Sequence, residues 1–101
     1  YFYENDEGIF EIKDILLLDE SQNPELSMLK DLFWKELLDA VQELPANQRL
    51  VFIENEMEDK TLQQIAEEQG ENIKTIISRK GYAMKHLRKK LNLIYEDILK
   101  N

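Results

Sequence analysis

The chain has 101 residues, a length that suits one small domain. Its net charge of −8 argues against nucleic-acid binding when the total alone is considered, and its 43% hydrophobic content argues against wholesale disorder. It has no cysteine and only one histidine, His86, which excludes disulfides, cysteine-based metal sites and HExxH zinc sites. We therefore expect no enzyme, no metal and no cofactor.

The longest apolar run, Ile15 to Leu18, is too short to span a bilayer, and no signal-peptide pattern opens the chain. These features predict a cytoplasmic protein that does not associate with a membrane. The chain begins at Tyr1 instead of Met, which favours a piece of a longer protein.

Charge is distributed unevenly along the chain. Residues 1–71 hold 5 basic and 19 acidic side chains, whereas residues 72–101 hold 8 basic and 2 acidic ones. A basic C-terminal segment on an acidic body is a pattern associated with nucleic-acid contact.

The first half of the chain predicts an acidic linker or tail over residues 1–23, followed by helices. Asn23 and Pro24 form a helix start, with a side-chain cap and Pro at the first helical position. Apolar residues then recur at three- and four-residue steps up to Leu44, as on one face of a helix. Pro45 ends this helix and opens a second one, which we expect over residues 46–57.

The second half predicts two further helices joined by a tight turn. Thr61 and Gln64 make a capping box for a short helix, and Gly70 stands where a left-handed C-terminal cap is needed. Asn72 caps a last helix that we expect to reach about residue 99. No strand pattern appears, so we expect an all-α fold: a small helical bundle with a C-terminal helix-turn-helix and a long recognition helix over residues 24–101.

The last helix separates into an apolar arc and a polar arc. Lys80 is the only polar residue on the apolar arc, and we expect its ammonium to reach out to solvent. The opposite arc has no carboxylate; its members are Lys74, Thr75, Ser78, Arg79, Tyr82, Lys85, His86 and Lys89. Such side chains can bond phosphates and base edges.

This arrangement predicts a DNA-reading helix. The N-terminal residues of a helix in the major groove reach base edges, so Thr75, Ser78, Arg79 and Tyr82 are the candidates for base readout. Residues further along the helix are placed for phosphate, as are Lys60 and Thr61 at the start of the preceding helix. The phosphate candidates on the last helix are Lys85, Arg88 and Lys89.

Three motifs together resemble region 4 of bacterial sigma factors. Residues 44–52 are similar to its LP-x-x-QR-x-VF opening, residues 61–66 to its S-x-x-E-IA helix, and residues 75–79 to the T-V-x-SR of its recognition helix. The spacing resembles that of the extracytoplasmic-function group, and the resemblance covers about residues 24–95. It implies a domain that binds promoter double-stranded DNA at the minus-35 element, docks on the β flap of RNA polymerase core, and has an anti-sigma factor as a possible partner.

The resemblance also implies particular DNA-contacting residues. They are Arg49 for the DNA backbone, with Thr61, Lys74, Thr75, Ser78 and Arg79. Gln64, Ile77 and Gly81 depart from the family pattern, the last two by removing potential phosphate contacts. Nothing in residues 1–23 resembles the region that melts the minus-10 DNA, which predicts a C-terminal fragment of an alternative sigma factor.

Two other functions remain open on the sequence. The domain could act mainly by docking on polymerase or on an anti-sigma factor, in which case Leu50 and Phe52 would matter more than Arg79. It could also be a stand-alone helix-turn-helix regulator that dimerises on two half-sites. We expect solvated positions for His86 and for the acidic cluster between Glu54 and Asp59. Phe33 is expected to pack in the core, and for Trp34 both core packing and a partner-facing patch stay open.

Overall fold

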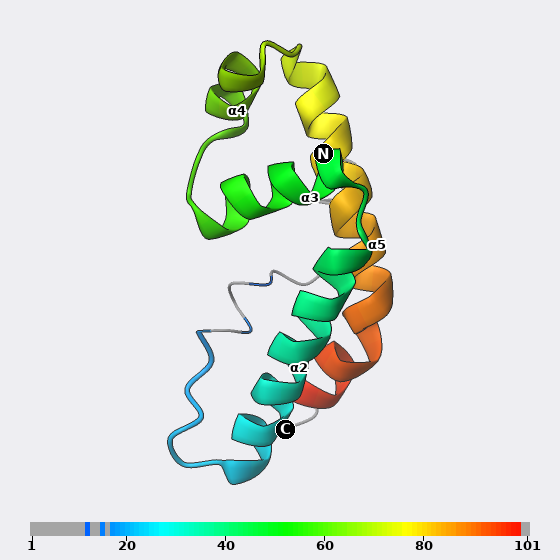
Figure 1. Ribbon diagram of the computed structural model, residues 1–101. Helices are drawn as coiled ribbons and strands as arrows, with labels where there is room; N and C mark the ends of the chain where they lie inside the picture. The colour runs from blue at the N-terminus through cyan, green and yellow to red at the C-terminus, as the bar shows by residue number, and fades with distance from the viewer. Residues whose placement is uncertain (1–11, 13–14, 16, 100–101) are drawn as a thin grey trace.

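The computed structural model describes residues 12, 15 and 17–99. Over these residues the chain forms helices and no strand, which confirms the all-α prediction. The elements in order are α2 (Pro24–Glu43), α3 (Ala46–Phe52), the π-helix η1 (Ile53–Met57), α4 (Leu62–Gln69) and α5 (Ile73–Leu99). Helix α5 runs the length of the molecule, with α2 beside its C-terminal half and with α3 and α4 at its N-terminal half (Figure 1).

The predicted helix starts are confirmed by their hydrogen bonds. The Asn23 side chain accepts a hydrogen bond from the backbone N–H of Leu26 at 3.1 Å, and Pro24 is the first helical residue. At α4, the Thr61 hydroxyl accepts from the Gln64 backbone N–H at 3.0 Å while the Gln64 side chain accepts from the Thr61 N–H at 2.8 Å. This reciprocal capping box satisfies two helix-terminal donors that would otherwise lack partners.

The turn between α4 and α5 depends on Gly70. This residue is left-handed, with φ of 65°, and the following Glu71 N–H bonds back to the carbonyl of Ala66 at 2.9 Å. Glycine reaches this conformation without steric cost, which is why it ends the helix here. Two residues later, the Asn72 side chain accepts from the Lys74 backbone N–H at 2.7 Å and starts α5, as predicted.

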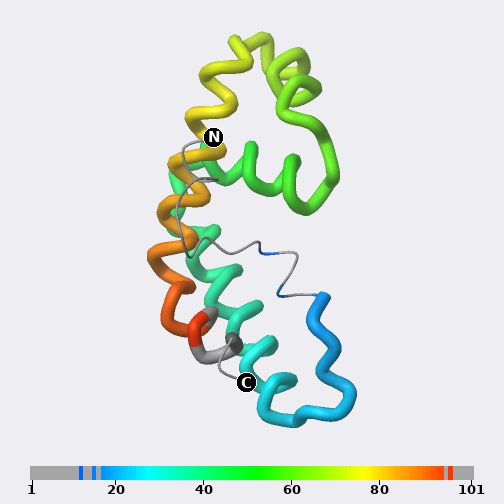
Figure 2. The backbone as a smooth tube through the Cα atoms, turned by 180° about the vertical axis from the view of Figure 1, so that it is seen from behind, coloured from blue at the N-terminus to red at the C-terminus, as the bar shows by residue number. Residues whose placement is uncertain are grey.

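Two hydrophobic clusters hold the helices together, and α5 contributes to both. The first lies between α2 and the C-terminal half of α5 and includes the fully buried Phe33, Leu37, Leu87 and Leu91. The second lies between α3, α4 and the start of α5, and its buried members are Val51, Ile65, Ala66 and Ile76. The view from behind shows the same division, with α2 packed along the lower part of α5 and the α3–α4 segment at its upper end (Figure 2).

The predicted helix over residues 46–57 changes its geometry midway. It is α-helical to Phe52 and π-helical from Ile53 to Met57, and Asp59 then adopts a positive φ of 59°. A π-turn adds a residue between hydrogen-bonded partners, so it rotates the side chains that follow it. Apolar spacing over five residues could not reveal this change.

The predicted tail contributes to the core. Ile12 and Ile15 are buried in the first cluster, although the sequence predicts an acidic linker or tail for this segment. Residues 1–11, 13–14 and 16 lie outside the described residues, so the boundary at residue 23 stays a prediction.

The prediction for Lys80 was wrong. Its side chain is only 3% exposed, and its ammonium stays inside, where it pairs with the Glu56 carboxylate at 2.9 Å and donates to the Asn55 side chain. The residues that hold it come from η1, whose π-turn directs their side chains at α5. A partner on a neighbouring element made burial of the charge possible, and the sequence of α5 alone could not show it.

Candidate nucleic-acid interface

Five of the predicted DNA-binding residues line one open hollow of about 440 Å³ between α3 and α5. They are Lys74, Thr75, Ser78, Arg79 and Tyr82, and they face Asn47 and Gln48 of α3 across it. The hollow is therefore lined by donors and acceptors, with a positive charge at two positions and no carboxylate.

The α5 side of the hollow follows from helical spacing. Residues 75, 78, 79 and 82 are three or four positions apart and so share one face of the helix. Ser78 and Tyr82 are exposed, the latter to 60%, and Thr75 is partly exposed. The apolar face of the same helix is buried in the two clusters, so packing leaves this polar face directed outward.

Arg79 is held at the edge of the hollow by the last residue of α4 and by the turn that precedes α5. One guanidinium nitrogen donates to the Gln69 side-chain oxygen at 3.3 Å, and the other lies 4.0 Å from a Glu71 carboxylate oxygen. The side chain is 23% exposed. These partners orient the guanidinium without covering it, so an anionic ligand would compete with Glu71 for it.

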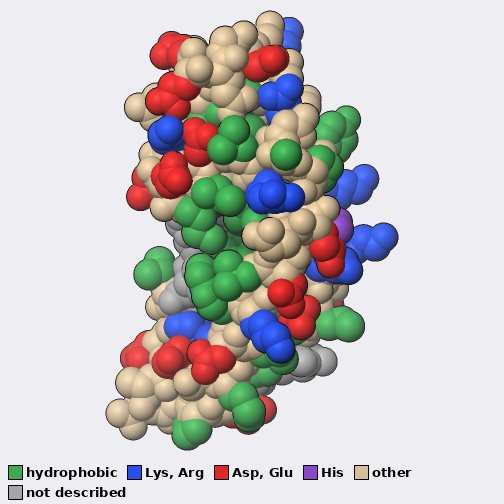
Figure 3. All heavy atoms as spheres, in the orientation of Figure 1, with side chains coloured by type: hydrophobic (Ala, Val, Ile, Leu, Met, Phe, Trp, Pro, Cys, Tyr) green, Lys and Arg blue, Asp and Glu red, His purple; other side chains and the backbone are tan. Residues whose placement is uncertain are grey.

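Two other predicted residues extend the basic face along α5. Lys85 and Lys89 are exposed and lie beyond the hollow toward the C-terminus. Lysine and arginine side chains project along the right-hand edge of the molecule, where α5 runs (Figure 3). This edge contrasts with the acidic side chains at the upper left of the same view.

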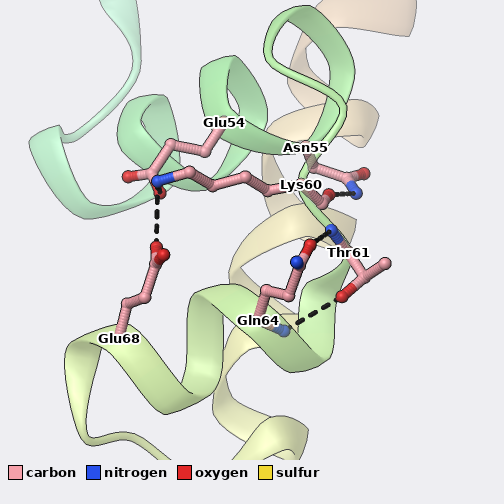
Figure 4. A network of polar contacts seen from close by, with 6 residues as sticks. All are labelled: Glu54, Asn55, Lys60, Thr61, Gln64 and Glu68. Atoms are coloured by element: carbon pink, nitrogen blue, oxygen red, sulfur yellow. Dashed lines mark hydrogen bonds and ion pairs between the residues drawn. The ribbon is translucent and has the colours of Figure 1, made fainter.

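Lys60 and Thr61 lie outside the hollow and have structural partners. The Lys60 ammonium pairs with Glu54 at 3.1 Å and with Glu68 at 2.9 Å (Figure 4). Hydrogen bonds from Lys60 to Glu68 and then to Glu54 raise the pKa of this lysine. The Thr61 hydroxyl is occupied by the capping box, although the residue is exposed.

Arg49 also lies outside the hollow and is bonded to backbone. One guanidinium nitrogen donates to the Leu44 carbonyl at 3.0 Å and is 3.4 Å from the Gln42 carbonyl. These carbonyls belong to the C-terminal end of α2, which favours a cation. Arg49 thus joins α3 to α2, while its buried Nε atom has no partner within the described part of the chain.

His86 is partly exposed, at 36%, which fits the expected solvated position, and its ring also lies 3.0 Å from the Glu43 carboxylate. The expectation for the acidic cluster needs correction. It is not a uniform solvated face, because Glu54 and Glu56 are only 12% and 17% exposed and are paired with lysines. Phe33 is fully buried as predicted, whereas Trp34 is 39% exposed.

Sequence reasoning missed Asn47 and Gln48 as part of the hollow. Both stand in the motif that opens α3, beside Arg49, but an amide side chain in a first turn gives no signal of its own. Only the packing of α3 against α5 brings them opposite the polar face of α5.

The fold and this polar face define a class of protein. Two helices, α4 and α5, are joined by a tight glycine turn, and the second presents a basic and hydrogen-bonding surface, as in helix-turn-helix DNA-binding domains. The family of sigma-70 region 4 matches residues 34–87, which is over half of the chain, and the chain belongs to this family. No curated protein and no solved structure matches it.

Membership in this family sets the general function. Sigma-70 region 4 is a DNA-binding regulatory domain of transcription initiation and not an enzyme family. The chain therefore has a DNA-binding role in promoter recognition within a sigma factor, and it is expected to interact with RNA polymerase. No helix among residues 17–99 is long and apolar enough to cross a membrane.

Proposed function

We propose that this chain recognises the promoter minus-35 element as the C-terminal domain of an alternative, extracytoplasmic-function sigma factor. It acts in the cytoplasm, docked on the β flap of RNA polymerase core, and an anti-sigma factor controls its availability. The observation that carries the proposal is the hollow between α3 and α5, because it gathers the polar residues of the recognition motif on one outward face.

In the proposed complex, the first turns of α5 enter the major groove. Arg79 donates to a guanine edge through its two guanidinium nitrogens, while Thr75 and Ser78 bond neighbouring base edges or phosphate. To do so, Arg79 exchanges its contacts with Gln69 and Glu71 for contacts with DNA. The backbone N–H groups at the start of α5 favour a nearby phosphate.

The other proposed contacts are to the DNA backbone and supply affinity without sequence information. They come from Arg49, Lys60, Thr61, Lys74, Lys85 and Lys89, while Tyr82 stays a candidate for base readout. Since Lys60 is already paired with two carboxylates, we expect its contribution to be smaller than those of Lys85 and Lys89, which are exposed.

The test is selection of random DNA duplexes by the chain tethered to polymerase core, repeated with Arg79→Ala. We expect an enriched motif that relaxes at one base pair in the variant, with a loss of about 1–3 kcal/mol at that position. Lys85→Ala is the matched control. It should weaken binding equally for all sequences, reduce the slope of log affinity against log salt concentration by about one, and leave the motif unchanged.

A second candidate function is docking on a protein partner without DNA reading. It is favoured by the net charge of −8 and by Leu50, which is 47% exposed on α3. Leu50→Ser would then abolish partner binding while Arg79→Ala had no effect. Phe52 cannot serve in this test, because it is fully buried and a polar substitution would disturb the fold.

A further inference from the structure

Lys80 follows Arg79 directly in α5, but the turn of about 100° between consecutive helical residues directs its side chain inward, where it is buried against η1. Its ammonium has two partners, the Glu56 carboxylate at 2.9 Å and the Asn55 side-chain oxygen. The lysine is 3% exposed and the glutamate 17%, so the ion pair is largely removed from solvent. Removing charges from water is costly, and apolar residues of similar size could fill the same space without that cost.

The same group of side chains also reaches α4. The Asn55 side-chain nitrogen donates to the backbone carbonyl of Lys60 at 2.8 Å, and Lys60 immediately precedes the Thr61 cap. Asn55 therefore contacts α5 through its oxygen and the start of α4 through its nitrogen. The close view shows Asn55 beside Lys60 at the entrance to α4 (Figure 4).

A third polar contact, near the surface, joins η1 to α4. Lys60 is paired with Glu54 of η1 and with Glu68 of α4. Three consecutive residues of the π-helix, Glu54 to Glu56, thus hold α4 and α5 by polar contacts. Hydrogen bonds and ion pairs depend on direction, whereas contacts between apolar side chains do not, so this network selects one arrangement of the two helices.

We infer that Lys80, with Asn55 and Glu56, is a positioning residue that sets α4 and α5 of the helix-turn-helix at the angle needed for DNA reading. It acts through the helix that carries Arg79 and touches no DNA itself. The expected effect on DNA selection rests on the proposed function, whereas the expected effect on the position of α4 does not.

The main test replaces the pair by apolar residues in the full chain, as Lys80→Met with Glu56→Met. This double variant leaves the net charge unchanged, so it alters no long-range attraction for DNA. We expect the unfolding midpoint in urea to be unchanged or higher. We also expect the amides of α4 to exchange with solvent about tenfold faster than in the wild type, with the amides of α2 unaffected.

In duplex selection with polymerase core, the same variant should enrich a broader motif while keeping its salt dependence. Glu43→Met with Lys90→Met is the matched control, because it removes exposed contacts between α2 and α5, those of Glu43 with Lys90 at 3.3 Å and with His86 at 3.0 Å, and touches neither α4 nor η1. It should change neither α4 exchange nor the motif. Lys80→Arg keeps the charge pair and should preserve both.

Asn55→Ala provides a milder variant should the double variant fail to fold. It cuts the contact to α5 and the contact to the Lys60 carbonyl while the Lys80–Glu56 pair remains, and it should also speed exchange in α4. Unchanged α4 exchange in a folded double variant, or in Asn55→Ala, overturns the inference. A wild-type chain that selects no DNA overturns the proposed function instead, and the exchange measurement still decides the positioning role.

Discussion

At the scale of single residues, neighbours in α5 have opposite environments. Ser78 is exposed, Arg79 is partly exposed and held by the turn before the helix, and Lys80 is buried against η1. Each residue turns about 100° from the one before, so two adjacent cations serve different surfaces. Net charge or a count of basic residues therefore says little about which cation can meet DNA.

Gly70 allows a prediction at this scale. Because its φ is 65° and an added Cβ would meet no atom within 4 Å, substitution costs backbone strain without a steric clash. We expect Gly70→Ala to lower the free energy of unfolding by about 1–2 kcal/mol, measured by urea denaturation. Gly70→Asn should cost less, since asparagine tolerates this conformation better. An unchanged midpoint for Gly70→Ala would mean that the turn rearranges.

The sequence predicted the roles of residues whose partners are close to them in the chain. Caps at Asn23, Thr61 and Gly70 depend on bonds to residues within five positions, and all three are present. The burial of Lys80 and the contact of His86 were missed because their partners, Glu56 and Glu43, are 24 and 43 positions away. The α5 residues that line the hollow belong to the predicted polar arc, whereas Asn47 and Gln48 of α3 were missed for the same reason.

At the scale of elements, the end of α2 carries a charge that its own helix disfavours. Glu43 is the last residue of α2, where the helix dipole is negative. Two side chains of α5 compensate: the His86 ring lies 3.0 Å and the Lys90 ammonium 3.3 Å from the same carboxylate oxygen. Hydrogen bonds from His86 and then Lys90 hold the pKa of Glu43 below its ordinary value of 4.5.

This shift predicts a dependence of stability on pH. A carboxyl group with a depressed pKa in the folded state stabilises the fold above its unfolded pKa and loses that contribution as the pH falls through the folded pKa. We therefore expect the stability difference between wild type and Glu43→Gln to favour wild type near neutral pH and to shrink as the pH falls below about 4.5. Urea midpoints measured from pH 7 to pH 3 give this difference directly.

Asp39→Asn is the control for this experiment, because it removes another exposed carboxylate from α2. A difference that stays constant with pH for Glu43→Gln, or the same pH dependence for both variants, would contradict the assignment. Since the pair is exposed, the effect should also weaken in high salt.

The π-helix is the element that sequence could not predict. Ala46 to Met57 has the apolar spacing of one helix, and the change to π geometry at Ile53 alters no residue type that such spacing uses. Its consequence is nevertheless large, because the contacts of Asn55 and Glu56 with Lys80 depend on it. Sequence alone therefore predicted four helical segments and their caps, but not the contacts that set the angle between α4 and α5.

At the scale of the whole molecule, the described chain has extents of 46 × 25 × 21 Å and two separate apolar clusters. Among the described residues, the second cluster has four buried members, and these include the buried apolar residues of α4, Ile65 and Ala66. Small clusters open locally at lower free energy than the molecule as a whole. The DNA-reading end is thus expected to be less stable than the end formed by α2 and α5.

Matched substitutions on α5 test this division. Ile76 and Leu87 are both fully buried on the same helix, the former in the second cluster and the latter in the first. Each change to alanine should lower the free energy of unfolding of its own cluster by about 2–5 kcal/mol.

We expect Ile76→Ala to speed hydrogen exchange in α4 while α2 keeps its protection, because α4 can detach without exposing Phe33 or Leu37. Leu87→Ala should lower protection in both, since loss of the larger cluster leaves α5 without its main support. Equal losses in α2 and α4 for Ile76→Ala would show instead that the two clusters unfold as one unit, and the α4 end would then have no separate stability for its polar contacts to tune.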